Sequence, residues 1–108
     1  MSDWQTRPEL DTTTVSTLVS AVGKPVFDDM KTQFVADLER LGREYAEARA
    51  RQDEAEARSV AHALKGAASN IGLMRLGALA AELEQGNAEL AGQLAPVLDS
   101  AVGKLMAA

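Results

Sequence analysis

The sequence of 108 residues predicts an all-α fold, an up-down-up-down antiparallel four-helix bundle with a short extra N-terminal helix. Alanine, leucine and glutamate are the commonest residues, and these residues have high helix propensity. No segment alternates apolar and polar residues with the period of two that is typical of a half-buried strand. Several segments instead repeat apolar residues at helical spacing and are joined by short connections, which place consecutive helices antiparallel.

The N-terminal part divides into a short lead-in and the start of the helical domain. We expect residues 1–10 to form a tail or strap and residues 11–108 to form a single domain. A first helix follows a cap at Asp11 or Thr12, since such side chains accept hydrogen bonds from the first backbone N–H groups. Its apolar residues recur at i, i+3, i+4 and i+7: Val15, Leu18, Val19 and Val22.

The second helix is expected to be the longest, over residues 26–50, after Gly23 and Pro25 end one helix and begin the next. Its apolar stripe consists of Phe27, Met30, Phe34, Leu38, Leu41 and Tyr45. The stripe stops near residue 51, and Asp53 is suited to cap a third helix that runs to about Asn70.

Two further helices follow. One begins near Leu73 and ends around Gly86, with an apolar stripe of Leu76, Leu79, Ala80 and Leu83. The last carries Leu94, Val97, Leu98, Ala101 and Leu105 on one face. Pro96 lies within it and is expected either to kink the helix or to mark its true first turn after a short lead-in.

Composition and charge exclude several classes of function. A formal net charge of −5 disfavours nucleic-acid binding, which needs a basic surface. A chain with one histidine and no cysteine offers no disulfide, no thiol nucleophile and too few ligands for a zinc site. There is no apolar run long enough to span a membrane, no secretory signal pattern and no Gly-rich phosphate loop. We therefore expect a cytoplasmic protein without a membrane segment or an ATP site of its own.

The single histidine, His62, faces away from the predicted core. On the third helix Val60, Leu64, Ala67 and Ile71 fall within a stripe of about 60°, and His62 lies about 180° from its middle. Its neighbours on this outer face are Arg58, Lys65, Gly66 and Ser69. A histidine in such a position is most often an ordinary surface residue, so its neighbours must carry any functional interpretation.

Gly66 favours a functional interpretation of this face. A glycine inside a helix costs about 1 kcal/mol relative to alanine, and Gly66 lies one turn from His62 on nearly the same side. Close helix packing is the usual reason for such a glycine, but Gly66 lies outside the apolar stripe. Space that lets another molecule reach the imidazole is the stronger explanation. Lys65, which could equally be a solvated lysine, can bring its ammonium near a group attached to His62.

The chemistry available to a lone imidazole is limited. With an ordinary pKa of about 6.5, much of a histidine population is neutral and nucleophilic near pH 7. Hydrolysis by a Ser/His/Asp arrangement needs an orienting carboxylate and an oxyanion hole, and an isolated helix face predicts neither. A single histidine can still accept and return a phosphoryl group, because the partner can bring the metal ion and a carboxylate. Lys65 would then offset the charge on the phosphorylated ring.

The segment His62-Ala63-Leu64-Lys65-Gly66, followed by small residues and Gly72, resembles the motif of histidine-containing phosphotransfer (HPt) domains. The next helix, with its spaced leucines ending in Leu83-Glu84, continues the likeness, which covers about residues 26–86. Ala67 and Ala68 stand where serines are common in the family, a change that keeps the small size.

The resemblance implies a phosphorelay carrier of the two-component systems, with a helical bundle and no kinase activity of its own. It implies that His62 is phosphorylated, normally through Nε2, that Lys65 stabilises the phosphorylated state, and that Gly66 gives the partner access. The partners would be response-regulator receiver domains and a hybrid histidine kinase, with Mg²⁺ on the receiver and no cofactor on this chain. Candidates for contact with the receiver are Arg58, Ser59, Ser69, Leu73 and Arg75.

Two alternatives to a phosphorelay carrier belong to other classes of protein. The first is an adaptor bundle that binds a signalling partner without phosphorylation, although the complete set of His62, Lys65 and Gly66 argues against it. The second is the dimerising phosphotransfer domain of a kinase, in which an acidic residue usually follows the histidine. Ala63 occupies that position here. For a complete bundle we expect a monomer.

Overall fold

The computed structural model describes residues 3–108, and within this range the regular structure is entirely helical. The α-helices are α1 (Thr12–Val22), α2 (Lys24–Ala50), α3 (Glu54–Asn70), α4 (Met74–Glu84) and α5 (Leu94–Ala107). Two short 3₁₀ segments, η1 (Trp4–Thr6) and η2 (Ala88–Gln93), precede α1 and α5 respectively. The predicted all-α helical bundle is confirmed.

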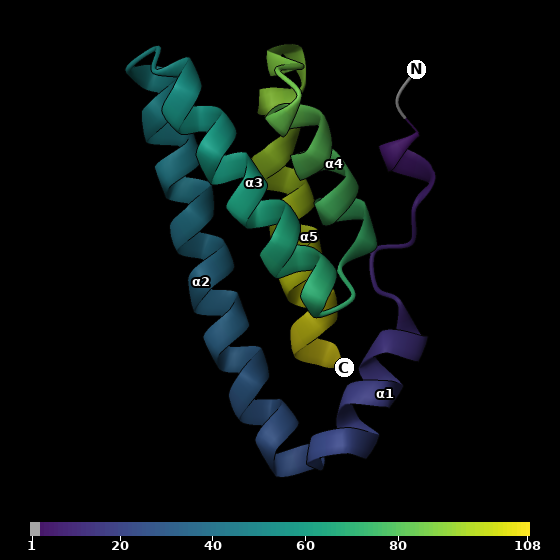
Figure 1. Cartoon of the computed structure of the whole chain (residues 1–108). Helices are drawn as coiled ribbons and strands as arrows, with labels where there is room; N and C mark the ends of the chain where they lie inside the picture. The colour runs from purple at the N-terminus through teal and green to yellow at the C-terminus, as the bar shows by residue number, and fades with distance from the viewer. Residues whose placement is uncertain (1–2) are drawn as a thin grey trace.

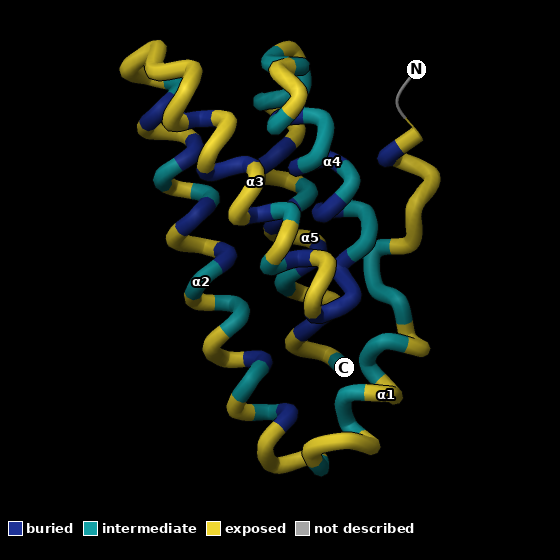
Figure 2. Tube along the Cα trace, in the orientation of Figure 1, coloured by how far each residue is buried: buried dark blue, intermediate teal, exposed yellow. Residues whose placement is uncertain are grey.

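Helices α2 to α5 form a closed ring around one core. In Figure 1, α2 and α4 run upward while α3 and α5 run downward, and the shorter α1 crosses below them. Helix α2 contacts α3 and α5, and α4 contacts the same two helices from the other side. Figure 2 shows the buried positions of α2, α3 and α4 on the sides that face the interior. The outer faces are left for solvent or partners.

The core consists almost entirely of aliphatic side chains. Its largest fully buried members are Phe27, Leu38, Leu64, Ile71, Leu73, Leu76, Leu79, Leu83 and Leu105. Full burial of a side chain of this kind contributes about 1.5–3 kcal/mol. Helices α3 and α4, together with the turn that joins them, supply six of these nine residues, so the packing of this helix pair dominates the core.

The helix starts follow from local side-chain chemistry. The Asp11 carboxylate accepts a hydrogen bond from the backbone N–H of Thr13 at 3.0 Å, and that of Asp53 accepts from Glu56 at 3.1 Å. These capping interactions confirm both predicted starts, and α3 ends at Asn70 as expected. Helix α2 begins at Lys24, two residues before the predicted start.

Pro96 marks a first turn and not a kink. It is the third residue of α5, which η2 precedes directly. Because the first backbone N–H groups of a helix have no acceptor within it, a proline there removes no helical hydrogen bond. The second of the two expectations for Pro96 is therefore correct.

The segment before α1 lies along α4. Trp4 is only 5% exposed and belongs to the core cluster. Pro8 and Arg7 are each held through their carbonyl oxygens by Arg75, whose backbone N–H donates to Pro8 at 3.0 Å and whose Nε donates to Arg7 at 2.9 Å. Residues 3–10 thus form a strap on the bundle, whereas residues 1–2 of the predicted tail lie outside the described residues.

Candidate functional site

His62 lies at the middle of α3 with its side chain 68% exposed. Val60 and Leu64, on the other side of the helix, are buried in the core. The helix-face prediction is therefore confirmed: the hydrophobic stripe fixes α3 against its neighbours, and this packing turns the imidazole outward. Nothing in the core depends on the ring itself.

Glu84, the last residue of α4, binds three side chains of α3. One carboxylate oxygen, Oε2, lies 2.7 Å from His62 Nδ1, and the other, Oε1, lies 2.7 Å from Lys65 Nζ. The backbone carbonyl of Glu84 accepts a hydrogen bond from Arg58 Nε at 2.7 Å. The three α3 residues are spaced by four and three positions, so one face of α3 meets the C-terminal end of α4.

These contacts keep Glu84 charged. The hydrogen bond from Lys65 and then that from His62 hold the pKa of the Glu84 carboxyl below its ordinary value, against a smaller opposing effect of burial. An ionised carboxylate can only accept hydrogen bonds, so the bond assigns the proton of a neutral imidazole to Nδ1. The lone pair then lies on Nε2, the nitrogen that is available for attack on an electrophile.

Next to the imidazole of His62, at Gly66, the surface has no side chain that would block access to the ring. A Cβ placed on Gly66 would meet no atom within 4 Å outside its own stretch of helix. About one turn after Gly66 on α3, at Ser69, helices α3 and α4 come close together. A Cβ on Gly77 of α4 would lie 2.9 Å from Ser69 Oγ. A partner can therefore approach His62 along this face without meeting a bulky side chain.

The structure separates the predicted contact residues into two groups. Arg58, Ser59 and Ser69 are exposed on α3, as expected for residues that a partner could touch. Leu73 is fully buried in the core, so its prediction as a contact residue is wrong. Arg75 holds the strap and lies nine residues before Glu84 on α4, about 14 Å along the axis, so the structure does not bring it to His62.

Glu84 is the functional residue that sequence reasoning missed. The helix face alone predicts no orienting carboxylate, but Glu84 reaches His62 from the neighbouring helix. The available signal was the position of Glu84 at the end of a helix that returns antiparallel to α3. Periodicity within one helix does not give the register between two helices, and it is this register that brings the pair together.

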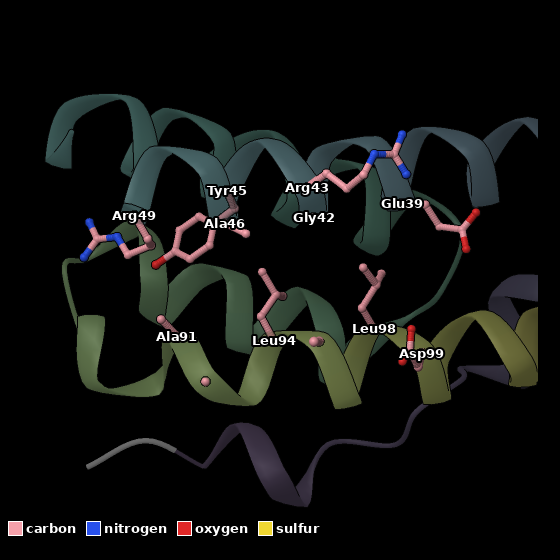
Figure 3. A pocket seen from close by; sticks show the side chains of 12 residues that line it. Glu39, Gly42, Arg43, Tyr45, Ala46, Arg49, Ala91, Leu94, Leu98 and Asp99 are labelled. Carbon is pink, nitrogen blue, oxygen red and sulfur yellow. The ribbon is translucent and has the colours of Figure 1, made fainter. Parts of the chain in front are cut away.

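A cavity lies elsewhere, between α2 and α5. It has a volume of about 590 Å³, and Tyr45, Leu94 and Leu98 contribute apolar surface to it (Figure 3). Arg49 lies at one end, and Glu39 and Asp99 lie at the other (Figure 3). None of the motif residues around His62 lines this cavity, so it is separate from the histidine site.

Comparison with known protein families agrees with this geometry. Among residues 3–108 no helix is long and apolar enough to cross a membrane, and no three acidic or histidine side chains gather as metal ligands would. No curated protein and no solved structure matches the chain. Residues 29–108 match the family described as the Hpt domain, and this segment includes His62, Lys65, Gly66 and Glu84. Because the match covers most of the sequence, the chain belongs to the Hpt domain family.

Proposed function

We propose that His62 accepts a phosphoryl group from a phosphoaspartyl receiver domain and passes it to another receiver domain. Membership of the Hpt family indicates a histidine phosphotransfer role in phosphorelays. The observation that supports His62 as the acceptor is its 2.7 Å contact from Nδ1 to Glu84, which in a neutral imidazole places the lone pair on Nε2 of an exposed ring. The free nitrogen and its orienting carboxylate are the two features that nucleophilic attack needs.

In the proposed step the Nε2 lone pair attacks phosphorus in line with the bond to the aspartyl oxygen. A nitrogen–phosphorus bond forms, the phosphorus–oxygen bond breaks, and the aspartate leaves as a carboxylate with the bonding electron pair. No proton has to leave Nε2. The ring, now with a proton on Nδ1 and phosphorus on Nε2, carries a positive charge that faces the Glu84 carboxylate. A Mg²⁺ ion held by the receiver, and not by this chain, would supply charge neutralisation at the phosphoryl oxygens.

Lys65 and Gly66 have supporting roles in this proposal. The ammonium of Lys65 lies one turn from His62 and is bound to Glu84 Oε1, from which it can turn to a phosphoryl oxygen on the ring. Gly66 leaves the approach to the ring open. The free energy of transfer comes from the phosphoaspartate, so the domain acts as a carrier and not as a kinase.

The test is transfer of labelled phosphoryl groups from a panel of Mg²⁺-loaded phospho-receiver domains to the wild type and to His62→Ala. We expect acid-labile, alkali-stable label on the wild type alone, while circular dichroism shows the same helix content for both. A variant that is labelled as well as the wild type would refute His62 as the acceptor. A folded wild type that takes no label from any donor would instead favour the adaptor function.

Glu84 variants extend the same assay. A hydrogen bond to a charged group is worth about 1.5–3 kcal/mol, so Glu84→Ala should slow transfer by about 10–100-fold. Glu84→Gln keeps an acceptor for Nδ1–H but loses the charge, and we expect an intermediate rate. If both variants transferred at the rate of the wild type, the orienting role of Glu84 would be wrong.

A further inference from the structure

Residues 3–10, the strap, lie beside the surface of α3 and α4 that carries His62 and Glu84. Residues 3–10 precede the segment that matches the Hpt family, so the family match does not account for them. In Figure 1, α4 lies between α3 and this strap. Burial of Trp4 and the hydrogen bonds from Arg75 fix the strap in place. The strap is therefore an ordered part of the surface beside α4.

A groove of about 350 Å³ runs over α4 between the strap and α3. Its lining includes Arg7 of the strap, Lys65 and Ser69 of α3, and the side chains of Met74, Ala78 and Ala81 on α4. The floor is apolar, and charged groups lie along the rim. Gly77 keeps the floor low, since a larger residue there would meet Ser69.

This groove is continuous with the phosphotransfer site. Lys65 lines the groove and also contacts the carboxylate that holds His62. Ser69, another lining residue, lies seven residues after His62, about 10 Å along α3. A typical interface covers about 800 Å² on each partner, which corresponds to a radius of about 16 Å. A folded domain centred on His62 would therefore cover the groove.

Arg7 is suited to recognise such a domain. Its carbonyl oxygen accepts the hydrogen bond from Arg75 Nε, which fixes the backbone at the groove rim. Its guanidinium lies 3.9 Å from Asp3, and both side chains are more than half exposed. Because an exposed ion pair of this kind contributes little, Arg7 can exchange Asp3 for an acidic side chain of a partner at small cost.

We propose that the strap is the second wall of the receiver-docking surface. An apolar side chain of the receiver enters the groove over α4, and an acidic side chain beside it binds Arg7. Arg7 is then a specificity-determining residue and not a catalytic one. This inference rests on the proposed phosphotransfer function of His62, and it assigns the choice among receivers in part to a segment outside the family match.

The experiment compares Arg7→Glu with Arg43→Glu, which makes the same charge change on exposed α2 beside the cavity between α2 and α5. Potassium phosphoramidate first labels each protein without a receiver, which measures His62 chemistry alone. The phospho-receiver with the highest rate on the wild type then serves as the donor, and KM and kcat are measured at low and high salt.

We expect equal labelling of all three proteins by phosphoramidate. With the receiver, Arg7→Glu should raise KM by about tenfold with kcat nearly unchanged, and the difference should shrink in high salt because screening weakens a rim charge contact. Arg7→Ala should have a smaller effect of the same kind, and Arg43→Glu should change KM by less than about twofold. If Arg7→Glu left KM unchanged while the wild type was active, the proposed role of the strap would be wrong. Absence of label on the wild type from every donor would overturn the proposed function as well.

Discussion

The Glu84 carboxylate determines which nitrogen of His62 is free. Its contact with Nδ1 comes from a different helix, so the reactive state of the imidazole depends on the packing of α4 against α3. The same carboxylate binds Lys65, which couples the cation to the ring through one shared acceptor. A change at any of these three side chains therefore alters the environment of the other two.

This sharing predicts how Glu84 titrates. Its hydrogen bond to Lys65 is the largest cause of its lowered pKa, so Lys65→Met should raise the pKa of Glu84 toward its ordinary value of 4.5. Because the folded pKa lies below the unfolded one, the stabilising contribution is complete above about pH 4.5 and is lost as the pH falls through the folded pKa. Carboxyl ¹³C NMR titration of the wild type and Lys65→Met measures this, and an unchanged Glu84 midpoint would contradict the assignment.

Individual site residues differ in how far the sequence predicts them. His62, Lys65 and Gly66 lie within five positions of one helix, so helical geometry alone places them on one face. Glu84 is 22 positions from His62, and its role depends on the register between two helices. Leu73 was misplaced for a related reason: it ends the turn after α3, where the chain folds back into the core.

The turn between α3 and α4 sets that register. Gly72 has a φ of +86°, and its carbonyl accepts a hydrogen bond from the Asp11 N–H at 2.7 Å. A Cβ at this position would lie 3.1 Å from Thr14 Cβ and 3.2 Å from the Asp11 carbonyl oxygen. The turn thus needs glycine both for its backbone conformation and for the close approach of the segment that leads into α1.

Two glycine-to-alanine changes should have opposite effects on stability. Gly72→Ala should lower the free energy of unfolding by about 1–3 kcal/mol, because alanine is strained at this φ and crowds Asp11 and Thr14. Gly66→Ala should raise it by about 0.5–1 kcal/mol, because the site is helical and open. Urea unfolding followed by circular dichroism gives both values. Equal effects of the two changes would show that backbone conformation does not distinguish these glycines.

The helices themselves are well predicted where local chemistry determines their ends. Asp53 and Asn70 mark the start and end of α3 because a capping carboxylate and a following glycine act within a few residues. The sequence allows a short lead-in before α5 but does not predict its 3₁₀ form. Its sequence, Ala88–Gln93, has no capping side chain and could equally continue a helix, so its shape depends on packing against α4 and α5.

At the level of the whole molecule, the ring of four helices separates two surfaces. The face of α3 and α4 carries His62 and its partners, whereas the cavity between α2 and α5 is lined by neither of those two helices. The sequence predicts the bundle because every helix has one apolar stripe. It does not predict where helices leave space between them, since that depends on side-chain shapes across the interface.

The distribution of apolar residues predicts a monomer. Among residues 3–108, the exposed large hydrophobic side chains are Val22, Val26 and Met106, at 38, 48 and 51%. An obligate dimer would need a much larger apolar surface. We expect sedimentation equilibrium at micromolar concentration to give the monomer mass of 11.4 kDa. A mass twice as large would mean that one of the outer faces is an interface between copies.

The hydrogen bonds that hold the strap also bear on the order in which parts of the chain fold. They join Pro8 to Arg75 and Asp11 to Gly72, positions more than sixty residues apart. Contacts between such distant positions form only after a large loss of chain entropy, unless the intervening helices have already brought the ends together. Helices α1, α2 and α3 lie between these positions, so we expect them to pack before the strap docks. By the same reasoning, the strap is the part of the folded protein that can detach while the helical ring stays intact.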